Sequence, residues 1–542
     1  MHISFLSAIT DYLRGDGAVI LPEVQLTLFG LGILLIDFTL GAKERYLNAG
    51  LAFVGTLFSA YTVWKLRLPV ATNGSRYGFH DSVIVDPFFL FFAGLFLAAT
   101  ALVILLSVKF LEIEQEQEGE YYALLLFACV GMMFMASGSD LIVMFLGLET
   151  MALSFYVLTG FLRRDKRSNE ASLKYVLLGA FSSGILAYGF SFLYGLSAST
   201  NIGLIGSALG QLRQLAHVVA VSHLSGAQGE PMRQMLQRDL PIAQNFDPVL
   251  LQLLPILAFV LVAVGLFFKV AAVPFHQWAP DVYEGAPTPI TTYVSVASKT
   301  ASFALLLRLF LNVFTVSRME WIYLVAGIAV ASLTWGNLAA ITQTNVKRLL
   351  AYSSISHVGY ILLGVVGAFS VEGPGLNQAG AKGIAFYLLA YVFMTTGAFA
   401  VIIVLRQKGL IGEELEDLNG LYQRSPAAAV LLLIFMLSLA GIPPTAGFMG
   451  KYFIFLSLIE THHPVLVLIA ALYIVPALYY YFRIIVHAWL KQPGEAPRPV
   501  MSSAQAVALG VAVFVTLAAG LYPEPFTRLA EYAQLAQYAL GR

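Results

Sequence analysis

Long apolar stretches, separated by short polar segments, run along almost the whole chain. An α-helix needs about 20 apolar residues to cross the ~30 Å hydrocarbon core of a bilayer. Stretches of that length predict about fourteen membrane-spanning helices, so we expect an all-α polytopic membrane protein. The predicted spans lie near residues 19–40, 46–66, 88–108, 121–138, 140–161, 170–196, 249–273, 287–314, 319–342, 346–369, 380–407, 427–460, 465–490 and 503–522.

Two hydrophilic inserts interrupt this pattern. Residues 67–87 contain short strand-like fragments with turn residues between them, and they predict a short hairpin outside the membrane. Residues 197–248 are polar and contain several Gln and Arg residues, and we expect them to form a long external loop.

Two of the predicted helices are interrupted by proline. Pro274 and Pro280 stand in KVAAVPFHQWAPDVYEGAPTP, and Pro443 and Pro444 stand in LAGIPPTAGFMGKYFIF. Proline removes a backbone donor and clashes with the preceding turn, and irregular backbone at membrane depth occurs only where protein or water satisfies it. Interrupted helices at corresponding positions of two halves indicate an inverted-repeat transporter. We therefore expect two inverted five-helix repeats, each with one broken helix.

The order of the predicted spans divides the chain into four parts. Residues 1–119 hold the first three helices and the hairpin-like insert, 120–318 the first five-helix repeat with the long external loop, 319–490 the second five-helix repeat, and 491–542 the C-terminal helix. The repeat is inexact, because Lys269 precedes its helix break whereas Lys451 follows its own.

Composition agrees with a membrane protein. Of the 542 residues, 58% are hydrophobic and only 11% are charged, whereas a soluble domain carries about 25% charged residues. The formal net charge is zero, so nothing in the charge balance indicates a nucleic-acid partner. The segment MHISFLSAITDYLRGDG does not resemble a signal peptide, since Asp11 and Arg14 follow a short apolar stretch.

The sequence offers no means of redox or phosphoryl chemistry. Cys129 is the single cysteine, and no CxxC or paired-histidine spacing is present, so an iron–sulfur cluster or a metal site is not expected. Neither a phosphate-binding GxxxxGK[ST] loop nor a strand–GxGxxG–helix unit appears. We expect no cofactor in this chain.

Four ionisable residues stand in the middle of long apolar runs. They are Glu149, Lys269, Lys299 and Lys451. A charge at the centre of a membrane helix costs about 2.5–3.5 kcal/mol, so four unpaired charges would cost roughly 10–14 kcal/mol. A chain keeps such groups only where they pair, line a hydrated cavity or carry an ion. The pattern favours a proton or cation path.

Each of these residues also has a purely structural interpretation. Glu149 could form an ion pair with a lysine of a neighbouring helix, although a pair that breaks during ion transfer would serve both purposes. Burial disfavours the charged form of an amine, and a nearby carboxylate favours it. A lysine whose partner moves can therefore load and release a proton. We predict that Lys269, Lys299 and Lys451 are successive stations of one hydrated route, with Lys299 in an unbroken helix and Lys451 nearest the external exit.

Other polar residues give weaker signals. Lys174 lies near the start of its helix and is either part of the route or an interface residue that extends towards water. His357, flanked by serines, is either a relay group or a packing histidine. By position alone, Lys347 is expected at the membrane interface, and Arg308 and Arg483 are expected to be interfacial anchors.

The distribution of Lys and Arg predicts the orientation. Cytoplasmic loops carry an excess of these residues, and the segment 163–167 (RRDKR) holds the densest cluster. With this loop inside, the basic residues near 347, 406 and 483 lie on the same side. Both termini are then outside.

Six segments together resemble the antiporter-like subunits of respiratory complex I, most closely the subunit N type of bacterial NADH:quinone oxidoreductase. They are DLIVMFLGLETMALSFYVLTGF, EASLKYVLLGAFSSG, FKVAAVPFHQWAPDVYEGAPTPIT, ASKTASFALLLRLF, TNVKRLLAYSSISHVGYILLG and LAGIPPTAGFMGKYFIF. The resemblance spans about residues 120–490, and the third and fifth segments are specific to this superfamily. The 197–248 insert is a departure from the usual pattern.

The resemblance implies the roles of six residues in proton translocation. Glu149 and Lys269 match the coupled pair of helices 5 and 7, Lys299 the central lysine of helix 8, and Lys451 the lysine of the broken helix 12. Lys174 and His357 match further members of the family's hydrated polar axis. A lysine at 451 and an end soon after helix 14 match subunit N better than the related subunits M and L.

The resemblance also implies partners and location. Such a chain would be a multi-pass protein of the bacterial inner membrane, surrounded by lipid and by other membrane-arm subunits, including a neighbouring antiporter-like subunit and small membrane subunits. NADH, FMN, iron–sulfur clusters and quinone would bind in partner subunits. The alternatives are a subunit of an Mrp-type cation/proton antiporter, a membrane subunit of a related hydrogenase or dehydrogenase complex, and a stand-alone solute carrier.

Overall fold

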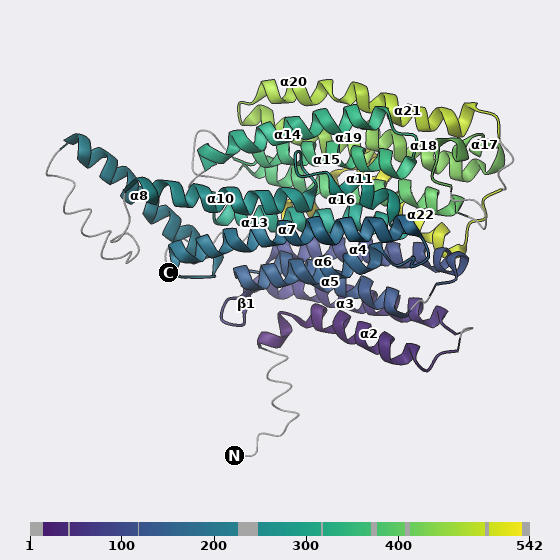
Figure 1. Cartoon of the computed structure of the whole chain (residues 1–542), viewed down its shortest axis with the longest axis horizontal. Coiled ribbons are helices and arrows are strands. Elements are labelled where there is room, and N and C mark those ends of the chain that lie inside the picture. Colours follow the sequence, from purple (N-terminus) through teal and green to yellow (C-terminus); the bar gives the residue numbers. More distant parts are fainter. Residues whose placement is uncertain are drawn as a thin grey trace, which may run out of the picture.

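The computed structural model describes residues 15–41, 44–116, 119–225, 248–315, 318–369, 377–406, 412–493 and 498–533. Almost all of them belong to helices, which run side by side through the body (Figure 1). The first part of the chain forms η1 (Asp16–Ala18), α2 (Leu21–Asp37), α3 (Tyr46–Asn73), β1 (Arg76–Gly78), β2 (Val83–Val85), α4 (Pro87–Glu114), α5 (Gly119–Ser137), α6 (Leu141–Thr159), α7 (Lys166–Ser197), α8 (Ile202–Ser225), α10 (Pro248–Val270) and α11 (Trp278–Gly285).

The second part contains the remaining helices. It forms α12 (Thr288–Tyr293), η3 (Val294–Ser298), α13 (Lys299–Asn312), α14 (Arg318–Ile341), α15 (Val346–Gly367), α16 (Gln378–Leu405), η5 (Leu415–Leu418), α17 (Leu421–Arg424), α18 (Pro426–Ala440), α19 (Ala446–Glu460), α20 (Pro464–Leu472), α21 (Ile474–Leu490), α22 (Ser503–Leu521) and α23 (Glu524–Tyr532).

The number of spans agrees with the hydrophobic pattern. Within the described ranges, 12 helices are long and apolar enough to cross a membrane. Two predicted spans fall outside this set: α2, with 17 residues, and the interrupted span, whose halves α18 and α19 have 15 residues each. The predicted all-α polytopic fold is therefore confirmed.

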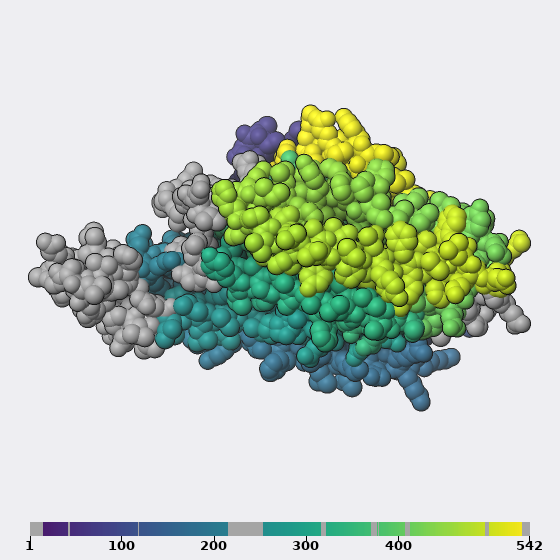
Figure 2. Space-filling view, turned by 90° about the horizontal axis from the view of Figure 1, so that it is seen from above, coloured from purple at the N-terminus to yellow at the C-terminus, as the bar shows by residue number. Residues whose placement is uncertain are grey.

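The helices are arranged so that one span is enclosed by the others. In Figure 1, α2 and α3 lie at one side of the body and α14, α20 and α21 at the other. Figure 2, viewed from above, shows the yellow-green helices α20 and α21 running along the length of that face. Every residue of the central span, from α12 through α13, is buried up to residue 311. This enclosed span carries Lys299.

Both predicted helix breaks are present. Residues 271–277 separate α10 from α11, and residues 441–445 separate α18 from α19. Each break begins with a residue in the left-handed region, Ala271 at φ 61° and Gly441 at φ 84°. Glycine adopts this conformation without a Cβ clash. The chain therefore leaves the helix at the positions where the prolines predicted it.

The span of Lys299 is less regular than the sequence suggested. Residues Val294–Ser298 form a π-helical segment directly before Lys299, although no proline lies within it. A π segment is rare and is frequently found at functional sites. It widens the helix by one residue, and local apolar periodicity does not reveal such an insertion. The span nevertheless continues without a break from Thr288 to Asn312, as predicted, and only its π segment was not expected.

The two hydrophilic inserts differ in outcome. The hairpin is present, with β1 paired antiparallel to β2. The second insert begins with helix α8 rather than with a loop, and residues 226–247 lie outside the described part. Ile202, Ile205, Leu209 and Leu212 are buried along α8 at helical spacing. That period was present in the sequence but was obscured by the surrounding polar residues.

The loops that carry the basic residues lie on one face of the bundle. Arg164, Lys347 and Arg406 line the same cavity. Arg483, half-buried, donates 2.6 Å to the carbonyl of Ile341 at the end of α14, so it fixes a helix terminus rather than extending into lipid. The predicted grouping of these loops on one side is consistent with the structure.

Arg308 is not an interfacial anchor. It is fully buried and forms two hydrogen bonds of 2.8 Å with Asp86, and its Nε donates 2.7 Å to the carbonyl of Ala136. Asp86 also caps α4 by accepting from the amide of Phe89. The sequence prediction for Arg308 failed because its partner lies 222 residues away along the chain.

Candidate proton-translocation site

Glu149 and Lys269 lie close together between α6, α7 and α10. Lys269, 5% exposed in the last turn of α10, donates a hydrogen bond of 3.0 Å to Ser183 of α7. Glu149 lies near enough to interact electrostatically with Lys269. One oxygen of its carboxylate is buried without a hydrogen-bond partner among the described residues. The carboxylate can therefore accept a further proton or water.

Lys299 lies in the most enclosed part of the bundle. Its amine, on a side chain 1% exposed, donates a hydrogen bond of 2.6 Å to Ser354 of α15. The same nitrogen lies 5.4 Å from the centre of the Tyr283 ring. The hydroxyl of Tyr283 is buried without a partner among the described residues. One strong hydrogen bond and an aromatic face leave this ammonium only partly satisfied.

His357 lies near both Lys299 and Lys451. Its Nδ1 lies 2.6 Å from the Tyr387 hydroxyl and its Nε2 3.1 Å from the Tyr481 hydroxyl. It also lies within electrostatic range of Lys299 and Lys451. An imidazole between two hydroxyl groups can take a proton on one nitrogen and release one from the other. The arrangement suits a relay group better than a packing histidine.

Lys451 belongs to α19 but reaches back across the helix break. Its amine donates 2.7 Å to the carbonyl of Ala440, the last residue of α18, and lies 4.8 Å from the Tyr360 ring centre. The carboxyl end of a helix carries partial negative charge and unpaired carbonyls. Within the described part of the chain, the end of α18 therefore holds the ammonium of Lys451 without a carboxylate partner. Lys269, by contrast, belongs to the helix that precedes its break, and its amine donates to Ser183 rather than to a helix-end carbonyl.

Lys174 lies apart from this group. Its side chain is 42% exposed and forms ion pairs of 2.8 Å with Glu170 and Asp281. Arg348 joins the same cluster through Asp281 and Glu284, at 2.8 and 2.9 Å. The structure thus places Lys174 in a surface ion-pair cluster beside the broken helix, not among the buried lysines.

A row of aromatic side chains, which the sequence did not predict, runs from Tyr156, which lies within electrostatic range of Glu149, to Tyr283 beside Lys299. The ring of Tyr156 packs 4.8 Å from Tyr175, and Tyr175 stacks 4.8 Å from Trp278. Trp278 lies 6.5 Å from Tyr283, which faces Lys299. The hydroxyls of Tyr156 and Tyr283 are buried without partners among the described residues. Buried hydroxyl groups of this kind are normally satisfied by internal water.

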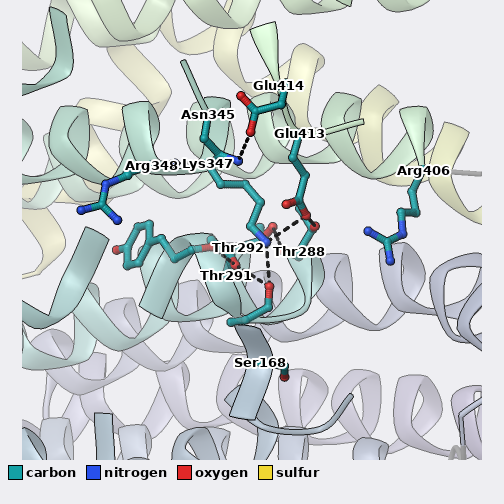
Figure 3. A network of polar contacts seen from close by, with 12 residues as sticks. Ser168, Thr288, Thr291, Thr292, Asn345, Lys347, Arg348, Arg406, Glu413 and Glu414 are labelled. Atoms are coloured by element: carbon teal, nitrogen blue, oxygen red, sulfur yellow. Dashed lines mark hydrogen bonds and ion pairs between the residues drawn. The ribbon is translucent and has the colours of Figure 1, made fainter. Parts of the chain in front are cut away.

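A buried ion pair was also missed. Lys347, expected at the interface, is 1% exposed and lies 3.0 Å from Glu413, which is 6% exposed. Figure 3 shows the two side chains pointing toward each other, while Arg348 points away. Lys347 was misplaced because it stands in the first turn of α15, where a lysine ordinarily reaches solvent. Here the loop that carries Glu413 covers it.

The buried groups that the structure brings together share one chemical property, the ability to exchange protons. Among the described residues, no group of three or more His, Cys, Asp or Glu side chains could hold a metal ion. What the structure gathers instead are single amines, one imidazole and several hydroxyls. These groups exchange protons with water and with one another.

Comparison with known families agrees with this geometry. Residues 138–475 match the family described as NADH:quinone oxidoreductase/Mrp antiporter, TM. The match covers more than half of the sequence, and the chain belongs to this family of membrane proteins.

Its relatives in this family are subunit N proteins. The chain is 48% identical over 525 residues to NADH-quinone oxidoreductase subunit N 2 of Solibacter usitatus, which covers 96% of this chain and 98% of the relative. It is 38% identical over 520 residues to NADH-quinone oxidoreductase subunit N of Trichlorobacter lovleyi, covering 95% and 96%. The resemblance to the subunit N type is therefore confirmed.

Solved structures share the fold. A chain of respiratory complex I from Thermus thermophilus with bound aureothin superimposes with a TM-score of 0.72 at 29% identity, over 94% of this chain and 99% of that one. A chain of the Mrp complex from Dietzia sp. gives a TM-score of 0.74 at 21% identity, over 94% and 96%. The second likeness concerns the fold alone.

Proposed function

We propose that this chain is a proton-translocating membrane-arm subunit of an NADH:quinone oxidoreductase. The observation that carries the proposal is a set of ionisable groups inside the bundle: the buried Lys269, Lys299, His357 and Lys451, together with Glu149, one carboxylate oxygen of which is buried without a partner among the described residues. They lie inside a bundle whose relatives are subunit N proteins of that complex. Buried ionisable residues in membrane helices mark ion paths and proton relays.

The route runs through these groups in the order of their contacts. In the first transport half, a proton passes between Glu149 and Lys269. The hydroxyls of Tyr156 and Tyr283 hold water that connects this pair with Lys299. His357 takes the proton onward from Lys299, and Lys451 delivers it nearest to the exit. The amine of Lys451 donates to the carbonyl of Ala440 at the carboxyl end of α18, where a proton can wait before release. Lys174 belongs to the route at the protein surface, beside α11, the second half of the first broken helix.

The energy for transport comes from partner subunits. Moving one charge against 100 mV costs about 2.3 kcal/mol, and this chain is proposed to bind no cofactor of its own. NADH, FMN, iron–sulfur clusters and quinone are assigned to other subunits, and lipid and neighbouring membrane-arm subunits surround this one. The isolated chain should therefore show no flavin, haem or iron–sulfur absorption, and a stoichiometric chromophore would contradict this assignment.

The proposed location is a bacterial inner membrane with both termini on the periplasmic side. Residues 120–318 and 319–490 act as the two transport halves, and the loop 163–167 faces the cytoplasm. The support is the common face of the basic loops together with the excess of such residues on cytoplasmic sides.

The direct test is proton pumping by the purified complex in liposomes. NADH and quinone are added outside the liposomes. The complexes whose NADH sites face outward should then pump protons inward and acidify the lumen. Lys299→Arg in this chain should reduce the protons moved per NADH oxidised. A subunit of an Mrp-type antiporter, the second candidate because of the shared fold, would instead exchange Na⁺ for H⁺ without NADH. Respiration-independent exchange at a native rate would favour that candidate.

A further inference from the structure

A cavity reaches the buried Lys347–Glu413 pair from the face that carries the basic loops. Its volume is about 440 Å³. Arg164 and Arg167 at its outer end are exposed, whereas Lys347 and Glu413 at its inner end are 1% and 6% exposed. Both signs of charge line it, since Glu114 and Arg406 also contribute. The Lys347–Glu413 pair thus lies at the inner end of the cavity, at the boundary between the loop face and the helix bundle.

The amine of Lys347 is bound but not saturated. It donates 3.0 Å to Glu413 and 2.7 Å to the carbonyl of Ala286, at the end of α11. The same oxygen of Glu413 accepts a hydrogen bond of 3.3 Å from Thr288 (Figure 3). An ammonium has three protons to donate, so one of them remains for a water or another group.

Beyond the pair, polar groups continue toward Lys299. Ser354, the acceptor of Lys299, stands two turns after Lys347 on the same face of α15, a separation of about 10 Å along the helix axis. The hydroxyls of Tyr283, Tyr391 and Thr395 are buried without partners among the described residues. Buried hydroxyls of this kind are commonly satisfied by internal water, so the zone beside Lys299 is polar enough to hold water.

The Lys347–Glu413 pair is not needed to hold its loop in place. The amide of Val346 donates 2.7 Å to the carbonyl of Glu413, and that of Leu415 donates 3.0 Å to Thr344. Asn345 adds a bond of 3.0 Å to the carboxylate of Glu414. These bonds fix the loop to the start of α15 without either charged group. A buried ion pair also carries a desolvation cost that its attraction often fails to recover, so attachment alone does not account for it.

We propose that Glu413 and Lys347 form the inner gate of a proton uptake route that supplies Lys299 from this cavity. The proposal rests on the proposed function and adds two residues and a direction of supply to it. Its substrate is a proton delivered by cavity water.

The transfer leaves the pair unchanged at the end. Glu413 takes a proton from hydronium in the cavity, which leaves as water, and the neutral carboxyl no longer holds Lys347. The Lys347 ammonium then gives a proton through water to the neutral amine of Lys299. The proton on Glu413 passes to the neutral Lys347 amine and restores the ion pair. One proton has moved inward.

Three variants in the full complex test this gate. Glu413→Gln removes the proton acceptor, and Lys347→Arg keeps the ion pair but removes the proton donor, since arginine stays charged. Glu414→Gln is the matched control, because this neighbouring carboxylate is exposed and points to Asn345. Assembly is measured by native mass spectrometry, and NADH-driven lumen acidification is measured in liposomes.

We expect Glu413→Gln and Lys347→Arg to lower the pumping rate by about a hundredfold, the scale at which removing a positioned proton-transfer group acts. Glu414→Gln should pump at the native rate, and the Lys347→Arg complex should assemble normally. Native pumping by Lys347→Arg overturns the gate, whether or not Glu413→Gln assembles. If Lys299→Arg still blocks pumping in that case, the proposed function stands; if it also pumps normally, the proposed function fails too.

Discussion

The amine of Lys451 donates a hydrogen bond of 2.7 Å to the carbonyl of Ala440, eleven residues earlier and across a break in the helix. The bond is possible because Gly441 turns the chain at φ 84°, and a Cβ on this glycine would lie 2.9 Å from the lysine amine. The Lys451 side chain thus packs directly against the end of α18. The position of the Lys451 amine therefore depends on the geometry of the break.

Gly441→Ala should therefore impair both folding and transport. The left-handed conformation costs an L-residue about 1–2 kcal/mol, and the added methyl group displaces the Lys451 amine. We expect a lower thermal midpoint for release of the subunit from the complex, together with slower pumping. Thermal denaturation followed by native electrophoresis measures the first effect, and lumen acidification measures the second.

The matched control is Gly510→Ala. Gly510 lies within α22 and is exposed, and a methyl group added to it would meet nothing within 4 Å. Alanine in a helix interior is more favourable than glycine by roughly 0.5–1 kcal/mol. This variant should keep or raise the thermal midpoint and pump normally. Equal behaviour of the two variants would contradict the role assigned to Gly441.

Glu149→Ala and Lys269→Ala should each reduce proton pumping and the coupled reduction of quinone. Each change removes a proton site and leaves its partner in a buried environment, with a penalty of about 3–5 kcal/mol where a buried pair is broken. The amine of Lys269 keeps its bond to Ser183 in the Glu149 variant, so assembly should be largely retained there. If both variants assemble and pump at the native rate, this pair plays no part in transfer.

The Asp86–Arg308 pair should act on stability alone. Asp86→Asn keeps an oxygen to cap α4 but leaves the buried guanidinium without its counter-charge, at a cost of about 3–5 kcal/mol. The double variant Asp86→Asn, Arg308→Met should recover much of that loss, because both charges are then gone. Thermal midpoints of the native complex and the two variants decide the matter. A double variant less stable than Asp86→Asn would contradict this account.

The hydrophobic pattern predicted the helices well because crossing a bilayer requires long apolar stretches. It also located the two breaks, since proline cannot continue a helix. The four intramembrane charges were visible for the same reason: any charge stands out in an apolar run. Their participation in transport stays a prediction.

Ion pairs between residues that lie far apart along the chain could not be predicted from the sequence. Asp86 lies at the end of a predicted span and Glu413 lies in a predicted loop. Acidic residues are common in both places, and nothing local indicates that these two meet Arg308 and Lys347. The π segment before Lys299 and the unpartnered hydroxyl of Tyr283 are likewise products of packing. Such features appear only when distant helices are brought together.

Cysteine labelling should determine the orientation. In a Cys129→Ser background, Arg164→Cys should react only with reagents that reach the cytoplasm, and Thr72→Cys only with external ones. Both positions are exposed; Arg164 lines the cavity beside the end of α4, whereas Thr72 precedes the hairpin that leads to the start of that helix. Labelling of intact cells and of inverted vesicles with a membrane-impermeant maleimide gives the assignment. External reaction at position 164 would reject the proposed topology.

Lys299→Arg is the most specific test of the relay. Lys299 donates to Ser354 at 2.6 Å and faces the Tyr283 ring at 5.4 Å, and an arginine can make both a hydrogen bond and an aromatic contact. The substitution therefore keeps a cation in this position, but it fixes the charge, because arginine is not deprotonated in proteins. The complex should assemble, yet its proton pumping should fall steeply. Lys299→Ala, which removes the cation as well, serves as the comparison. If Lys299 were a purely structural cation, pumping would be impaired in Lys299→Ala and retained in Lys299→Arg. Native pumping by the arginine variant in liposomes would remove Lys299 from the route and leave it as a packing cation.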